Sequence, residues 1–231
     1  DLMQLMQQEI VVLRKTFLFH RLTPAAYMKL SEQNLSGAFR TELRTGGQLE
    51  YPTEDRNYLG VVIGGELSEL REPTFPNRTL GEASVIGVMD LFSRERGPRD
   101  VIVAKNRSRV VFFSAQQIRE LFDAYPGMMM RYINFLTART QELRWEYLMA
   151  ATPSALDRVR KYCAAQLDAE SGMVPLPQSI SALAGRLHMS RSTLYRCLEQ
   201  LEQDGVLRRQ GKDLEILSPQ RLAERTAEPC G

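Results

Sequence analysis

The feature that most constrains the fold is the stretch 179–216, which predicts two short helices followed by a hairpin. A serine precedes each helix, Ser179 and Ser190, and its side chain can accept a hydrogen bond from the first helical turn. A tight turn at His188-Met189 joins the helices, and Gly205 ends the second one. Each helix has one apolar face, formed by Ile180, Leu183, Ala184 and Leu187 in the first and by Leu194, Leu198 and Leu201 in the second. This pattern is typical of a winged helix-turn-helix.

The outward face of the second helix carries residues suited to reading DNA. A helix fits the major groove of B-DNA, where side chains of its first turns meet base edges. Arginine can bond guanine through two hydrogen bonds, while hydroxyl and basic groups can contact phosphates. The hairpin that follows is basic at one end and can neutralise phosphates. The predicted DNA-binding residues are Ser190, Arg191, Ser192, Thr193, Tyr195 and Arg196 on the helix and Arg208, Arg209 and Lys212 on the hairpin.

A second function stays open for the same motif. Winged helices also dock proteins, so the alternative is an effector-sensing adaptor that binds a protein partner rather than DNA. The net charge of +2 is too small to indicate a nucleic-acid partner, and the prediction therefore rests on the local arrangement. The second helix holds two arginines and no acid before Glu199, which favours DNA. A steep salt dependence of binding would separate the two functions, since it reports phosphate contacts.

The N-terminal half predicts many short strands between residues 17 and 113. The runs 58–63 and 66–70 flank Gly64-Gly65, and a glycine pair between two such runs indicates a hairpin because glycine adopts positive φ easily. Further β-branched runs lie at 84–88, 101–104 and 109–113. Regularly spaced short strands favour a barrel or a sandwich.

In residues 116–152 the spacing of the apolar residues changes to that of a helix. The pattern predicts a long helix of roughly 25 residues, in which Pro126 fits an early position. Its apolar residues recur at alternating steps of four and three, which is the heptad spacing of a coiled coil. One domain rarely buries so long a helix unaided, so a two-fold dimer is favoured over packing on the chain's own barrel. The predicted dimer seam comprises Met129, Ile133, Leu136, Thr140, Leu143 and Tyr147.

Composition excludes several classes of protein. The chain has 231 residues, 43% of them hydrophobic and 25% charged, as in soluble globular domains. No apolar run approaches a membrane helix, the N-terminus lacks a signal-peptide pattern, and three separated cysteines fit a reducing cytosol. We therefore expect a cytoplasmic protein without a membrane partner. There is no P-loop, no G-x-G-x-x-G fingerprint and no nucleophile motif, so the sequence does not predict an enzyme or any catalytic residue.

A β-rich half, a long helix and a C-terminal winged helix, in this order, resemble the cyclic-AMP receptor protein / fumarate-nitrate regulator (CRP/FNR) family of bacterial transcription factors. The most specific part is 180–205, in which residues 189–198 are similar to the family's recognition helix. The resemblance places Arg191 and Arg196 where the family contacts DNA. Ser192 stands where many members carry a base-reading Glu, and His188 replaces the usual Gly of the turn.

The resemblance implies an α+β fold with four parts: a double-stranded β-helix (jelly-roll) sensor domain at 1–115, the dimerisation helix at 116–152, the winged helix-turn-helix at 153–220 and a tail at 221–231. It implies a homodimer that binds a pseudo-palindromic site in double-stranded DNA under the control of a small effector. Whether the protein contacts RNA polymerase, and whether it activates or represses, stays open.

The effector is not identified by the sequence. In relatives that bind cyclic nucleotides, a Gly-Glu pair and a later Arg-Ser/Thr-Ala run hold the phosphate and ribose. Gly81-Glu82 matches the first pair, but Arg99 is followed by Asp100, whose carboxylate would repel a phosphate. The family's purine-contacting Thr-Ser pair aligns with Leu143-Arg144. These departures argue against cyclic AMP or GMP, and the candidate effector pocket is limited to Glu82, Arg99, Met129 and Arg144.

Other cofactors have little support in the sequence. An iron–sulfur cluster needs about four thiolates, and none lies before Cys163. Haem needs an axial ligand, and His20 lies in an amphipathic segment where a structural role is expected. Cys197 lies toward the inward side of the second helix of the motif and is expected to be a packing residue. The sequence therefore predicts no metal site and leaves the effector unknown.

Overall fold

The computed structural model describes residues 2–30, 32, 37–53, 57–70, 77–95, 101–177 and 179–223. The chain divides into two compact units, one from Asp1 to Ala138 and the other from Arg139 to Gly231. Each unit has its own apolar core. Among the described helices, none combines the length and hydrophobicity that a membrane crossing requires.

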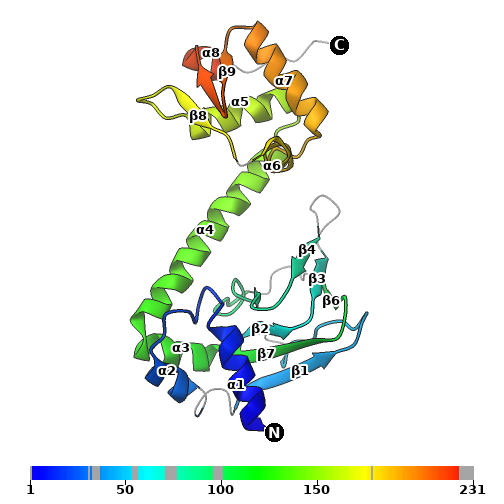
Figure 1. The fold of residues 1–231 in the computed structure, drawn as a ribbon, viewed down its shortest axis with the longest axis vertical. Coiled ribbons are helices and arrows are strands. Elements are labelled where there is room, and N and C mark those ends of the chain that lie inside the picture. Colours follow the sequence, from blue (N-terminus) through cyan, green and yellow to red (C-terminus); the bar gives the residue numbers. More distant parts are fainter. Residues whose placement is uncertain are drawn as a thin grey trace. The chain divides into compact units, whose positions relative to one another are not determined.

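Two antiparallel sheets form the frame of the first unit (Figure 1). One has the order β1-β7-β2-β5 and consists of Phe39–Leu43, Ser108–Ser114, Tyr58–Gly64 and Val85–Ile86. The other has the order β4-β3-β6 and consists of Arg78–Leu80, Leu67–Leu70 and Val101–Ala104. Strand β7 pairs with both β1 and β2, far from it in sequence, which is the long-range pairing of a jelly roll. The predicted α+β class with a jelly-roll domain is confirmed.

Gly64-Gly65 does not form the predicted hairpin. Strand β2 pairs with β5 and β7, whereas β3 pairs with β4 and β6, so the chain passes from one sheet to the other between them. Gly65 has a φ of 86°, and a Cβ there would overlap the carbonyl oxygen of Arg107 and the Ser108 hydroxyl. The glycine is required by this corner and by the close approach of the chain to β7.

The interior between the sheets is packed with apolar side chains. Phe112 lies at its centre, with ring centroids of Tyr51 and Tyr58 at 5.5 Å and 6.4 Å. Gly60 leaves room for this ring, because a Cβ there would come within 2.9 Å of it. Val62, Leu67 and other buried residues complete the core: Leu49, Leu80, Ile86, Ile102, Ala104 and Val110.

Helices α1 (Leu2–Leu13) and α2 (Pro24–Lys29) precede the strands and were not predicted from the sequence. Helix α1 is attached to strand β1 by Glu9, whose two carboxylate oxygens accept hydrogen bonds from Arg40 Nε and Nη2 at 2.7 and 2.8 Å. Glu9 is buried, so this fork also satisfies a charge that would be unfavourable alone.

The region 116–152, expected to be one dimerisation helix, contains two helices, and the second begins at Pro126 and has the predicted length of about 25 residues. Helix α3 (Ala115–Ala124) begins with a capping box of Ser114 and Gln117, and α4 (Pro126–Ala150) follows after a break at Tyr125. Pro126 begins α4 because its missing N–H is not needed in the first turn. Tyr132 attaches α4 to the first unit: its hydroxyl donates to the Val88 carbonyl at 2.6 Å, and burial raises its pKa to about 12.

The second unit combines the end of α4 with the remaining elements. These are α5 (Ala155–Gln166), β8 (Met173–Pro175), α6 (Ile180–Arg186), α7 (Arg191–Gln203), β9 (Leu207–Gln210), β10 (Asp213–Ile216) and α8 (Pro219–Ala223). Helix α5 contributes Cys163 to the core, and burial raises the pKa of this thiol to about 12. The strands form a sheet of order β8-β10-β9. Strand β8 was not predicted, and α8 extends into the segment expected to be a tail.

We expect Gly65→Ala to destabilise the protein much more than Gly46→Ala. Both glycines have positive φ, but a Cβ at Gly46 meets no atom within 4 Å. Gly46→Ala should lower the free energy of unfolding by about 1 kcal/mol through backbone strain alone. Gly65→Ala adds an overlap with rigid backbone and should lower it by about 3 kcal/mol or more. Urea denaturation followed by circular dichroism measures the free energy of unfolding of both variants. Equal losses of stability would contradict the requirement for glycine at the corner between the two sheets.

Candidate nucleic-acid interface

Two serine caps determine where the helices of the motif begin. Ser179 accepts a hydrogen bond from the Ala182 backbone N–H at 3.1 Å, and Ser190 accepts one from that of Thr193 at 3.1 Å. Both caps agree with the sequence prediction. Each satisfies an N–H group that the helix itself leaves without a partner.

The turn between α6 and α7 depends on a residue in the left-handed conformation. His188 has a φ of 52°, which histidine tolerates better than most residues. Its carbonyl accepts a hydrogen bond from Arg158 Nη1 on α5 at 3.1 Å. The Met189 N–H donates to the Ala184 carbonyl at 3.0 Å. Contacts from α5 and α6 therefore hold the turn that orients α7.

Helix α7 separates an inner face from an outer one, as its spacing predicts. Leu194, Leu198 and Leu201 are fully buried, and Cys197 is 8% exposed. The predicted DNA-contacting side chains on this helix lie on the outer face or at its first turn: Arg191, Ser192, Tyr195 and Arg196 are exposed, and Thr193 is half-buried. The helix can therefore present only this polar face to a partner.

The first turn of α7 holds a network of hydroxyl groups. Ser190 Oγ lies 2.9 Å from Ser192 Oγ and 2.8 Å from Thr193 Oγ1. Arg196 Nη2 is 3.5 Å from Thr193 Oγ1, so this arginine lies over the same turn. The positive end of the helix dipole adds to the charge of Arg191 and Arg196. The start of α7 is thus suited to a negatively charged partner.

The wing is the hairpin of β9 and β10. Its two-residue turn is Gly211-Lys212, with Gly211 at a φ of 62°. Arg208 pairs with Glu215 across the strands, and its Nε and Nη2 donate to Glu215 Oε2 at 3.0 and 2.6 Å. Arg208 is therefore already bound to a carboxylate.

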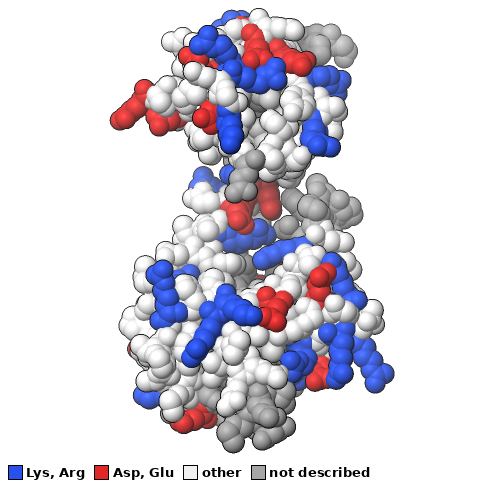
Figure 2. Space-filling view, in the orientation of Figure 1, with Lys and Arg blue, Asp and Glu red and all other residues white. Residues whose placement is uncertain are grey.

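Arg209 is held by Glu202 of α7. Glu202 Oε2 accepts from Arg209 Nε and Nη2 at 2.9 and 2.7 Å, and Oε1 accepts from the Arg209 backbone N–H at 2.9 Å. These bonds lower the pKa of the Glu202 carboxyl and raise the pKa of Arg209. Within the described part of the chain, Lys212 makes no hydrogen bond or ion pair and is exposed. Figure 2 shows acidic and basic side chains interspersed on this unit.

Sequence reasoning missed the residues that hold these arginines. The Arg208–Glu215 pair could have been found, because a two-residue turn at 211–212 places those residues opposite each other. Helix α8 was also missed: Leu222 is buried, and Arg221 Nη1 donates to the Asp204 carbonyl at the end of α7 at 2.7 Å. Its sequence signal is Pro219, a residue favoured in the first helical turn.

The predicted effector residues are not brought together. Glu82 accepts a hydrogen bond from Lys15 Nζ at 2.6 Å in a surface ion pair. Arg99 lies outside the described residues. Met129 is 41% exposed on α4 in the first unit, and Arg144 is exposed on α4 in the second.

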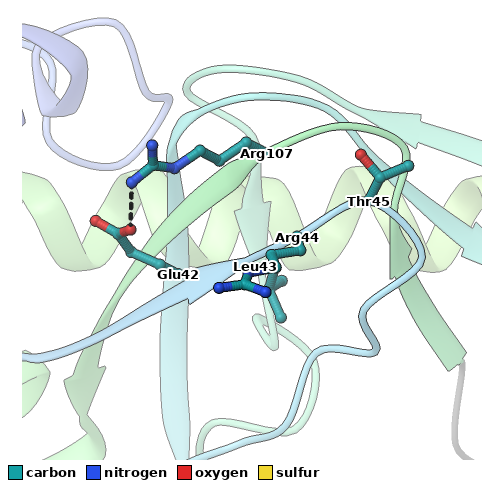
Figure 3. Close-up of a pocket in the computed structure, with 5 residues that line it drawn as sticks. All are labelled: Glu42, Leu43, Arg44, Thr45 and Arg107. Atoms are coloured by element: carbon teal, nitrogen blue, oxygen red, sulfur yellow. Dashed lines mark hydrogen bonds and ion pairs between the residues drawn. The ribbon is translucent and has the colours of Figure 1, made fainter.

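A surface pocket of about 580 Å³ lies on the first unit (Figure 3). Arg107 Nη2 donates to Glu42 Oε2 at 3.0 Å beside it. Its lining is Glu42, Leu43, Arg44, Thr45 and Arg107, which includes none of the predicted effector residues. The described residues contain no cluster of three or more His, Cys, Asp or Glu side chains that could hold a metal.

The predicted dimer seam lies on α4 and is largely exposed. Ile133 is 43% exposed, Leu143 38% and Tyr147 75%, and Thr140 is exposed as well. Leu136 is half-buried and packs against the core of the first unit. A row of exposed apolar side chains on one helix is a surface that association would cover.

Comparison with known proteins agrees with this architecture. Residues 155–225 match the family model of the Crp-like helix-turn-helix domain. No curated protein matches the chain in sequence. The fold is similar to the crystal structure of the catabolite activator protein from Thermus thermophilus, with a TM-score of 0.51 and 22% identity, covering 90% of this chain and 96% of that one.

A second similar structure is that of DNR from Pseudomonas aeruginosa, with a TM-score of 0.43 and 21% identity over 93% of this chain and 96% of that one. The matched domain comprises the caps, the turn, α7 and the wing described above, and the likeness to the catabolite activator protein extends the similarity of fold to the β-rich unit. Residues 155–225 therefore form a Crp-like helix-turn-helix domain, and the chain as a whole has a fold similar to that of the catabolite activator protein.

Proposed function

We propose that the protein is a cytoplasmic homodimer that binds a pseudo-palindromic DNA site through α7 and responds to a small effector in its β-rich unit. The observation that carries the proposal is the outer face of α7. Three leucines of this helix are fully buried, so Arg191, Ser192, Tyr195 and Arg196 form its exposed first turns. Side chains in these positions of a recognition helix meet base edges in the major groove.

The wing contributes phosphate contacts mainly through Lys212 in this proposal. Arg208 and Arg209 are bound to Glu215 and Glu202, and a phosphate would have to displace a carboxylate from each guanidinium. Lys212 lies at the turn without such a partner in the described chain. We therefore infer that Arg208 and Arg209 stabilise the conformation of the wing, and that Lys212 contacts the phosphates of the DNA backbone.

Dimerisation through α4 follows from its exposed apolar seam. The residues repeat at heptad spacing, and a second copy of the same helix presents a matching surface across a two-fold axis. Two recognition helices related in this way can read half-sites about one helical turn of DNA apart.

Selection of bound duplexes from a random DNA library tests the reading helix. The wild type should enrich a two-fold-symmetric site. Arg196→Ala should bind that site roughly tenfold to a hundredfold more weakly, since a bidentate arginine–guanine contact contributes to base discrimination. Arg44→Ala, an exposed arginine of the first unit, is the matched control and should bind normally. No retention of DNA at any salt concentration would favour the protein-docking adaptor.

The salt dependence of binding to the selected site tests the wing. Lys212→Ala should reduce the slope of log K against log salt by about 1.8, which is about 0.9 for one phosphate contact in each of the two protomers. Arg208→Ala should leave the slope nearly unchanged, because Glu215 already neutralises this side chain. Equal reductions in the two variants would show that Arg208 leaves its carboxylate to contact DNA.

Sedimentation equilibrium tests the dimer seam. Leu143→Glu should produce a monomer at micromolar concentration, because it places two like charges in an apolar two-fold contact. Gln141→Glu, exposed on α4 but outside the heptad positions, adds the same charge and should stay dimeric. A dimer that survives Leu143→Glu would place the interface elsewhere.

A further inference from the structure

The last turns of α4 lie inside the compact unit that holds the helix-turn-helix. Met149 is fully buried in the core of that unit, and Trp145 and Leu148 pack against it. Leu143 and Tyr147, on the same turns, are 38% and 75% exposed. Since residues three and four apart share a helix face, one face of α4 contacts the DNA-binding unit and another carries the proposed dimer seam.

Trp145 makes specific contacts with two other helices. Its indole Nε1 donates a hydrogen bond to the backbone carbonyl of Arg186 at 3.3 Å. The Arg186 guanidinium carbon lies 5.4 Å from the Trp145 ring centroid and 6.0 Å from that of Tyr162. The Trp145 and Tyr162 rings meet edge to face, with centroids 6.0 Å apart. We call Trp145, Tyr162 and Arg186, which belong to α4, α5 and α6, the arginine clamp.

A second group of contacts fixes the corner between α4 and α5. Thr152 is buried, and its hydroxyl donates to the Leu148 carbonyl at 2.7 Å. The same hydroxyl accepts a hydrogen bond from Lys161 Nζ on α5 at 2.7 Å. The arginine clamp and this corner act at different points, so together they restrict rotation of α5 and α6 about the end of α4.

We propose that Arg186 is a positioning residue for DNA recognition, which fixes the direction of the helix-turn-helix relative to the dimer helix by contacting the Trp145 and Tyr162 rings. The proposal rests on the proposed function. Arg186 is the last residue of α6, directly before the turn that leads to α7. In a dimer joined through α4, two such clamps set the distance between the two recognition helices, which must match the spacing of the half-sites.

The emission of Trp145, the only tryptophan of the chain, tests the clamp without DNA. In the full-length protein, Arg186→Ala should shift the emission to longer wavelength and increase quenching by acrylamide, because the indole loses its cover. Arg186→Lys should give an intermediate result, since lysine keeps the charge but not the planar group that stacks on rings. Arg44→Ala is the control. Unchanged emission and quenching in Arg186→Ala would overturn the clamp.

The positioning role is tested by comparing a complete two-fold site with a single half-site, both from the wild-type selection. A cation–π contact at an exposed position corresponds to a factor of roughly two to five, and a dimer holds two. Arg186→Ala should therefore bind the complete site about four- to twenty-five-fold more weakly and the half-site normally. Equal losses on both sites would mean that Arg186 only supports the fold of the reading unit, which would overturn the proposal.

The salt dependence of binding and a second variant distinguish the positioning role from a phosphate contact and from loss of folding. On the complete site, the salt slope of Arg186→Ala should equal that of the wild type, and a slope reduced by about 1.8, about 0.9 for each protomer, would show a phosphate contact instead. If circular dichroism shows Arg186→Ala to be unfolded, Trp145→Phe replaces it in the DNA comparison, because it removes the indole N–H and weakens the stack. Wild-type protein that binds neither site would refute the proposed function and the positioning role, whereas quenching would still report whether the clamp exists.

Discussion

A single apolar core orients every part of the second unit that would contact DNA. Leu194, Leu198 and Leu201 of α7 enter this core beside Met149 of α4 and Leu222 of α8. Packed interiors transmit displacement because they leave few voids. The exposed face of α7, the wing and the end of α4 are therefore fixed with respect to one another, and the polar residues on their surfaces inherit that geometry.

Fewer basic side chains of this unit are free to bind an anion than their number suggests, because two arginines of the wing are bound to glutamates. Glu215 and Glu202 hold Arg208 and Arg209 through paired hydrogen bonds, which give a definite geometry even where an exposed ion pair adds little stability. The arginines of the wing thus do not form a free basic surface. The positive potential is concentrated at the start of α7, where Arg191 and Arg196 meet the positive end of the helix dipole.

The β-rich unit combines an apolar interior with a surface ion pair at Glu82. Glu82, which the sequence predicts to be an effector contact, pairs with Lys15 near α1. The described space between the sheets is occupied by Phe112 and its aromatic and aliphatic neighbours. A ligand that entered this space would have to displace apolar side chains, so an effector would meet chemistry different from a polar phosphate cradle.

Local patterns in the sequence determined the helix-turn-helix, its serine caps, the two faces of α7 and the heptad spacing of α4. Each of these depends on residues a few positions apart, whose relation is set by helical geometry. The tertiary structure alone decided that Gly64-Gly65 joins two sheets, that Glu202 holds Arg209, that Glu82 faces Lys15 and that Arg186 lies against Trp145 and Tyr162. The partners in these contacts come from different elements, and no periodicity along the chain records which of them the folded core brings together.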